Sequence, residues 1–203
     1  MLIICSMQSS KLCHNNSMES LSLSNQFLIA MPKMTDPLFS RALVYVCEHG
    51  EHGSMGLIIN KPSGIVMAQL FDQVDLPLSN VAANSRPVFF GGPVQPDRGF
   101  VLHAPVGNWQ SSLIVTDTIA LTTSKDILIA VSEGNGPEQL VITLGYTGWQ
   151  SGQLEQEIAA NAWLTVEQEP EIIFSTPPEQ RYDKAMGLLG FDPSLLSDEV
   201  GHA

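Results

Sequence analysis

The most informative stretch of the chain is Gly145–Leu164, which reads GYTGWQSGQLEQEIAANAWL. It follows an apolar run, Leu140–Gly145, that is typical of a buried strand, and its glycines predict a turn into a helix. The helix is amphipathic, with an apolar stripe of Leu154, Ile158 and Ala162. Trp149 and Trp163 lie at the two ends of the helix, and we expect both indoles to be buried. The stretch contains no nucleophile–base pair, metal-ligand spacing or phosphate loop, so it defines a structural unit rather than a reaction.

The rest of the chain reads as short strands and a few helices. Apolar or β-branched runs predict strands at Phe27–Met31, Ala42–Cys47, Met55–Asn60, Pro87–Phe90, Gly99–Ala104, Leu113–Thr116 and Ile119–Leu121. Helices are predicted at Ile65–Val74 and at Lys125–Ser132. Two more helices are predicted to follow the capping sequences Thr147–Gln150 and Thr176–Glu179, and Asp75–Asn84 is predicted to be a loop. Strands joined mostly by tight turns indicate an α+β domain with a largely antiparallel sheet and about three or four helices.

Composition limits the classes of partner. The chain has 203 residues, enough for one domain, and 44% of them are hydrophobic, enough for a sizeable core. Its net charge is −12 and its pI about 4.6. Such a surface repels phosphate backbones, so direct DNA binding is disfavoured and a protein partner is expected.

Cysteine usage and hydropathy indicate a cytoplasmic protein. The three cysteines, Cys5, Cys13 and Cys47, make neither a disulfide framework nor a paired metal motif, which favours a reducing compartment. No apolar run approaches the roughly 18 residues of a membrane helix. Met1–Ser17 is polar and without periodicity, so we interpret it as a disordered or wrongly assigned extension that contributes no burial, ahead of one domain over residues 18–203.

Six segments together resemble the AlgH/YqgE family of bacterial proteins. They are Phe27–Arg41, Cys47–Pro62, Phe90–Val94, Gly99–His103, Gly145–Trp163 and Tyr182–Gly190. The resemblance covers essentially all of the chain from Met18 onward. It implies a split, barrel-like sheet flanked by helices. It implies little about activity, because members are mostly named as uncharacterised proteins or candidate transcriptional regulators, without agreed catalytic residues.

The densest group of ligand-type side chains is the run from Cys47 to His52. On one strand Cys47 and His49 would share a face, so a soft metal site is conceivable, but the run lacks a distant second half. The family pattern carries Glu48 and His49, whereas His52 falls in its variable loop. A buried structural thiol is the alternative for Cys47, and we expect neither a metal nor a cofactor.

Other candidates are weighed against structural roles. His103 ends a strand and could serve as a base beside Cys47 or Ser54, or could simply bond to backbone. Polar residues inside the family segments are candidates for binding or for fastening turns: Asp36, Arg41, Asn60 and Asn161. Gly91 and Gly92 could expose N–H groups to an anion or let strands pass closely, and an exposed Trp149 would indicate an interface.

The sequence therefore favours a cytoplasmic binding protein, either a regulatory module or a protein-interaction module, over an enzyme. The alternative is an enzyme that binds or hydrolyses a small molecule in a cleft near His49, His103 and Asp36.

Overall fold

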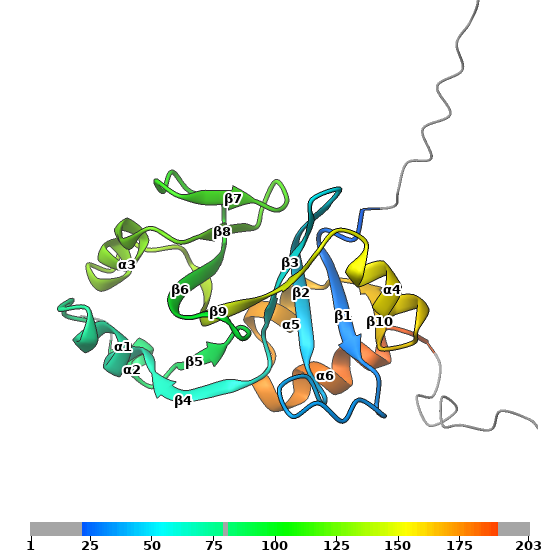
Figure 1. Cartoon of the computed structure of the whole chain (residues 1–203). Coiled ribbons are helices and arrows are strands. Elements are labelled where there is room, and N and C mark those ends of the chain that lie inside the picture. Colours follow the sequence, from blue (N-terminus) through cyan, green and yellow to red (C-terminus); the bar gives the residue numbers. More distant parts are fainter. Residues whose placement is uncertain (1–21, 79–80, 191–203) are drawn as a thin grey trace, which may run out of the picture.

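The computed structural model describes residues 22–78 and 81–190, which form one curled sheet with helices around it (Figure 1). The strands in these ranges are β1 (Gln26–Ala30), β2 (Leu43–Gly50), β3 (Gly53–Ile58), β4 (Pro62–Val66), β5 (Pro87–Phe90), β6 (Val94–Ala104), β7 (Ser112–Ile114), β8 (Ala120–Thr122), β9 (Gln139–Trp149) and β10 (Trp163–Glu167). The helices are α1 (Met67–Gln73), α2 (Val81–Asn84), α3 (Lys125–Ser132), α4 (Gln153–Ala159), α5 (Pro170–Phe174) and α6 (Pro178–Gly187). Met1–Ser17, the predicted extension, lies outside the described residues.

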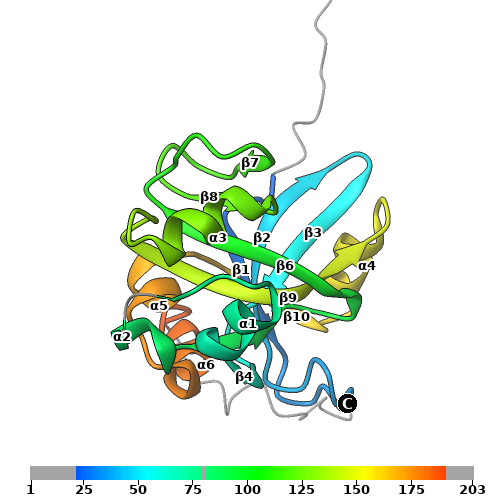
Figure 2. The ribbon, with the colours of Figure 1, turned by 90° about the vertical axis from the view of Figure 1, so that its left-hand side faces the viewer.

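The sheet confirms the predicted α+β class. Its strand order is β10-β1-β2-β3-β9-β6-β8-β7, while β5 pairs with β4 and also with β9. Among the described strands every pairing is antiparallel except that of β5 with β9. The sheet curls, so that the β2–β3 hairpin and the β6–β8 strands rise on either side of a central gap (Figures 1 and 2).

Strand β9 is longer than predicted, and the cap expected at Thr147–Gln150 is wrong. The strand continues through Trp149 because Thr147, Gly148 and Trp149 pair with β3. Helix α4 starts only at Gln153, behind Gly152, which has the left-handed φ of 74°. The Gln153 side chain accepts a hydrogen bond from the Gln150 N–H at 3.0 Å. This glutamine, and not Thr147 as expected, therefore satisfies a backbone N–H group just before the helix.

Three glycines, Gly91, Gly92 and Gly145, let the backbone after β5 pass in contact with β9. Gly145 sits within β9 at a φ of 71°, and a Cβ there would lie 2.3 Å from the Gly92 carbonyl oxygen. A Cβ on Gly91 would lie 2.2 Å from the Gly145 oxygen. Both Gly91 and Gly92 are buried. Of the two interpretations of this glycine pair, close passage of strands fits the geometry and an open anion site does not.

The two tryptophans are buried, as predicted. Trp149 is 7% exposed and Trp163 is 3% exposed, and their rings meet edge to face with centroids 6.0 Å apart. Both indole N–H groups donate to the same oxygen of Glu157, at 2.9 and 2.8 Å. Because Glu157 lies on α4, this carboxylate fastens the helix to the ends of both β9 and β10.

Two of the predicted helices agree well with the structure. Lys125–Ser132 is helix α3 as predicted, and α6 buries Tyr182, Ala185 and Met186. The cap predicted at Thr176–Glu179 was wrong, because α6 has no side-chain bond at its N-cap. Instead, the Thr176 hydroxyl accepts from Lys184, at 3.2 Å.

The described part of the chain also holds two short helices that the sequence reading did not include. Helix α2 lies within Asp75–Asn84, which was expected to be loop, and α5 follows β10. With four and five residues, these helices are too short to show a periodic stripe. In the described ranges, no helix is long and apolar enough to cross a bilayer.

Candidate functional site

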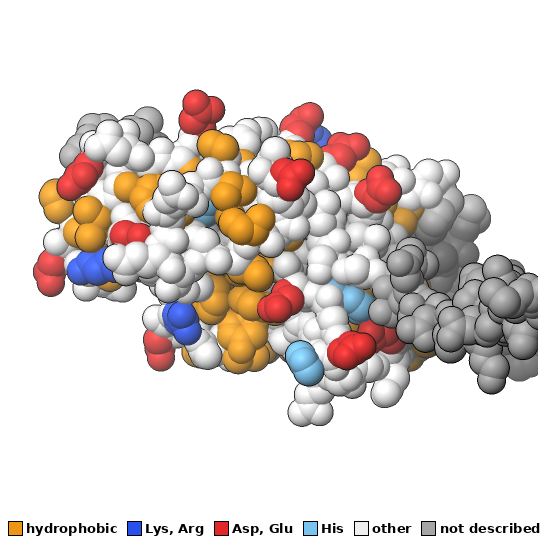
Figure 3. All heavy atoms as spheres, turned by 90° about the horizontal axis from the view of Figure 1, so that it is seen from above, with side chains coloured by type: hydrophobic (Ala, Val, Ile, Leu, Met, Phe, Trp, Pro, Cys, Tyr) orange, Lys and Arg blue, Asp and Glu red, His pale blue; other side chains and the backbone are white. Residues whose placement is uncertain are grey.

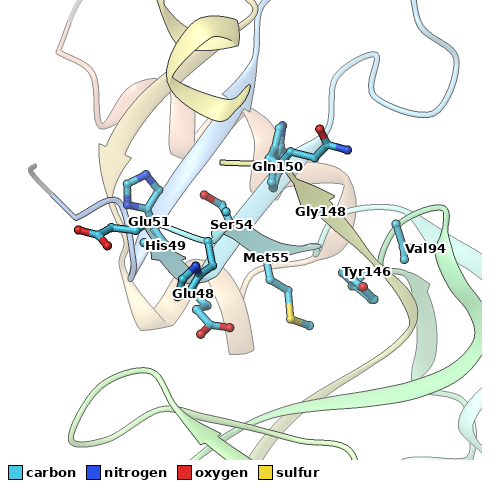
Figure 4. A pocket seen from close by; sticks show the side chains of 13 residues that line it. Glu48, His49, Glu51, Ser54, Met55, Val94, Tyr146, Gly148 and Gln150 are labelled. Carbon is cyan, nitrogen blue, oxygen red and sulfur yellow. The ribbon is translucent and has the colours of Figure 1, made fainter. Parts of the chain in front are cut away.

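A wide groove opens beside the β2–β3 hairpin (Figure 4). We call it the hairpin groove; its first part has a volume of about 560 Å³ and is lined by Glu48–Met55, Val94, Tyr146 and Gly148–Gln150. Glu48 and Met55 extend from the hairpin in the same direction, with Tyr146 of β9 and Val94 of β6 beside them (Figure 4). The lining therefore combines carboxylates of the hairpin with apolar side chains of the sheet.

The groove continues toward β7 and β8. A second cavity, of about 460 Å³, shares Glu48, Met55 and Tyr146 with the first. Its other lining residues are Gln95, Arg98, Phe100, Gln110–Leu113, Leu121 and Thr123. Figure 3, which looks down on this side of the molecule, shows hydrophobic side chains gathered in the middle, with more Asp and Glu than Lys and Arg around them.

A bulge in β2 separates the residues of the Cys47–His52 run. The register of β2 against β3 shifts between Val46 and Glu48, so Cys47 is the extra residue. Cys47 faces the core that contains Tyr45 and Leu57. His49 instead faces α4, where its Nε2 lies 3.0 Å from Glu155 Oε1 and its side chain is only 5% exposed. The bulge thus removes the shared face that the metal hypothesis needed.

Cys47 is not poised as a nucleophile. It is 3% exposed, and burial, with a smaller contribution from the charge of Glu48, raises the pKa of its thiol far above the usual value. A thiol in that state is neutral and poorly reactive. The described residues also contain no group of three or more His, Cys, Asp and Glu side chains arranged to hold a metal ion.

His103 is completely buried and held on both ring nitrogens. Its Nδ1 lies 3.0 Å from the Pro105 carbonyl oxygen and its Nε2 lies 2.9 Å from the Thr122 hydroxyl. A carbonyl can only accept, so Nδ1 carries the proton and Nε2 accepts from Thr122. Burial lowers the pKa of His103, although the bond to Pro105 opposes this. The arrangement is a neutral imidazole that fastens β6 to β8.

The remaining candidates hold turns and element ends. Asp36 Oδ1 accepts the Leu38 N–H at 2.8 Å, and Asn60 accepts from Leu43 N while it donates to the Arg41 carbonyl, both at 2.8 Å. Arg41 forms an exposed ion pair with Asp183, at 2.7 Å. Asn161 is exposed and has a left-handed φ of 55° at the end of α4. The first cavity is lined by His49 but by neither His103 nor Asp36, so these three do not share it.

Sequence reasoning missed the residues that shape the groove. Tyr146, Met55 and Val94 lie on three different strands, and local patterns carried no signal that they would meet. The sequence did contain a signal for the role of Glu157, because an acidic residue on a helix between two buried tryptophans can accept hydrogen bonds from both indole N–H groups.

Comparison with known proteins agrees with this fold. The AlgH-like family model (DUF179) matches residues 27–194. A UPF0301 protein of Chromobacterium violaceum is 74% identical over 186 residues, which cover 92% of this chain and all of that protein. The solution structure of the AlgH protein from Pseudomonas aeruginosa is 43% identical with a TM-score of 0.75, and the match covers 97% of this chain and all of that one.

A more distant crystal structure shares the fold. Protein DIP2367 from Corynebacterium diphtheriae superposes with a TM-score of 0.66 at 18% identity, over 86% of this chain and 91% of that one. From the extent of the family match and the identity to its relatives, the chain belongs to the AlgH-like family of UPF0301 proteins.

Proposed function

We propose that this protein is a cytoplasmic, non-enzymatic interaction module that binds a segment of a protein partner in the hairpin groove. The observation that carries the proposal is the composition of that groove, whose lining includes the apolar Met55, Tyr146 and Val94 together with the carboxylates of Glu48 and Glu51. An apolar floor with acidic neighbours suits a peptide segment that has both aliphatic and basic side chains. If the protein is a regulator, it would act by contacting other proteins and not DNA, because its net charge of −12 repels phosphate backbones.

Two further features support binding over catalysis. The histidine and the thiol with the most perturbed surroundings, His103 and Cys47, are both buried and outside the groove lining. Val94, at 36% exposure, is one of the few large hydrophobic side chains of the described chain that face solvent, and it lies at the groove. Exposed apolar groups at the rim of a wide groove are typical of contact surfaces.

Site-specific photocrosslinking in cells would test this proposal. A photoreactive amino acid at Val94 should give a defined protein adduct, whereas the same amino acid at Ile129 should give none. Ile129 is a matched control, because it is 39% exposed but lies on α3 away from the groove. Adding Glu51→Lys should weaken the Val94 adduct if the partner is basic. Equal adducts at both positions, or none at Val94, would contradict the proposal.

A further inference from the structure

A separate, small cavity outside the hairpin groove is flanked by two arginines. It has a volume of about 200 Å³ and lies between β9 and the segment that leads into α6. Its lining consists of Met67, Arg86, Pro87, Phe89, Leu140–Ile142, Phe174–Pro178 and Arg181. The chain has only nine Lys and Arg residues against 21 Asp and Glu, so two cations at one small cavity are a notable concentration.

Arg181 is buried and has no carboxylate partner within residues 22–78 and 81–190. It is 5% exposed, and its Nε and Nη1 donate to the carbonyl oxygens of Thr176 and Ile59. Its guanidinium carbon lies 4.8 Å from the centre of the Phe89 ring. Its remaining nitrogen, Nη2, has no hydrogen-bond partner among the described residues. A buried charge that lacks a counter-ion is costly, so an anionic ligand at this position would offset part of that cost.

Arg86 faces the same cavity and likewise has no acidic partner among the described residues. It is half-buried and donates through Nη2 to the Leu140 carbonyl oxygen at 2.8 Å. The ion pairs of the described chain involve neither Arg86 nor Arg181. Burial and the charge of Arg86 lower the pKa of Arg181 to about 10, and burial also lowers the pKa of Arg86. A guanidinium group nevertheless stays protonated at neutral pH. Glu179 opposes this shift but is exposed and forms no ion pair with Arg181.

We propose that this arginine cavity binds a small organic oxyanion, in which a carboxylate or phosphate is joined to a short apolar body. The guanidinium groups of Arg86 and Arg181 would neutralise the anion, since planar N–H forks match carboxylate and phosphate oxygens. Met67, Phe89 and Phe174 provide apolar walls for the rest of the ligand.

An NMR titration of the full-length, ¹⁵N-labelled protein would test the site. Sodium phosphate and sodium benzoate are added separately at neutral pH, with sodium chloride holding the ionic strength constant. We expect saturable shifts at the Arg181 side chain and at Thr176 for at least one probe, with a Kd on the order of 1 mM or tighter. Saturation by phosphate alone assigns a phosphate-type ligand, and saturation by benzoate assigns a carboxylate with an apolar body. Shifts no larger than those in chloride would overturn the proposal.

Variants separate binding from a structural role. Arg86→Gln should weaken the Kd by about tenfold or more through loss of charge-assisted bonds, and Arg86→Lys, which keeps the charge, should weaken it less. Arg41→Gln is the matched control, because this exposed arginine is outside the cavity and should change the Kd less than about twofold. Arg181→Gln is informative only if the variant folds, so the test relies on the Arg86 variants. An unchanged Kd in Arg86→Gln would overturn the proposal.

Discussion

At the scale of single residues, the junction of Trp149, Trp163 and Glu157 explains why the signature stretch is distinctive. One carboxylate accepts from two indoles that are both buried and in contact. The three residues come from the end of one strand, the middle of a helix and the start of the next strand. The motif therefore marks a folding anchor, and the groove proposed for binding owes its apolar surface to other residues.

Removing the second tryptophan should destabilise the whole domain. Trp163 is 3% exposed and packs against Trp149 and Phe39. Trp163→Ala should lower the free energy of unfolding by about 3–5 kcal/mol, the range for emptying a large aromatic site. Urea denaturation followed by circular dichroism measures this change. A loss of less than about 1 kcal/mol would mean that the site collapses around the missing ring or that the indole is exposed.

The carboxylate between the tryptophans should matter separately from their packing. Glu157→Ala leaves two indole N–H groups without their acceptor and should cost about 2 kcal/mol, whereas Glu157→Gln keeps an acceptor oxygen and should cost less. Gln156→Ala, on the exposed face of the same helix, is the control. Equal losses for Glu157→Ala and Gln156→Ala would show that the shared bond contributes nothing.

His103 should make stability depend on pH. Its folded pKa lies below the ordinary value of 6.5, so the unfolded chain takes up a proton at higher pH than the folded chain does. This contribution is therefore complete above about pH 6.5 and is lost as the pH falls through the folded pKa. Urea denaturation between pH 7 and pH 5 should show a decline that His103→Gln reduces. His52→Gln, an exposed histidine, should retain the wild-type slope, and an equal slope in His103→Gln would refute the assignment.

At the scale of elements, β9 organises the sheet because it pairs with β3, β5 and β6. Its path past β5 depends on Gly145, Gly91 and Gly92, where the two backbones meet without side chains. A conformational requirement and a steric requirement coincide at Gly145, which has both a left-handed φ and a neighbour within contact distance.

A pair of alanine substitutions should separate these two requirements. Gly134 has a φ of 80° with no atom within 4 Å of an added Cβ, so Gly134→Ala should cost about 1–2 kcal/mol from backbone strain alone. Gly145→Ala adds a clash with the Gly92 carbonyl, and should cost about 2 kcal/mol more, as overpacking does. Thermal and urea denaturation of both variants measure the difference. Equal losses would show that β9 moves aside without penalty.

At the scale of the whole molecule, the charge distribution limits the partners. The net charge is −12, and two of the four arginines face the small arginine cavity rather than an open surface. A basic patch wide enough for a duplex is difficult to assemble from the cations that remain.

Binding to duplex DNA should accordingly be weak. We expect a Kd no tighter than about 0.1 mM at physiological salt, the weak end of non-specific association. Fluorescence anisotropy with labelled duplexes of different sequence, at two salt concentrations, checks this. A sequence-selective complex at nanomolar concentration would reverse the ranking of protein partners over DNA.

The sequence predicted which segments form strands and helices better than it predicted which of these elements contact one another. Ala42–Cys47 was predicted to be a buried strand, and β2 is buried from Leu43 to Cys47, because local composition reports burial directly. Pro87–Phe90 was predicted to be a strand and is β5. Helix α3 was predicted to the residue. The bulge at Cys47 was not predicted, since it arises from the pairing of β2 with β3 and not from either strand alone.

The sequence by itself determined the α+β class, the buried tryptophans and the acidic surface, because hydrophobic period and charge are properties of short segments. Only the tertiary structure decided that Cys47 and His49 face different ways and that His103 is enclosed. It also decided which side chains line the hairpin groove and that Arg86 meets Arg181 across one cavity. The physical reason is that strand register and the crossing of β9 over β5 bring distant segments together, and one residue of register reverses the face on which a side chain lies.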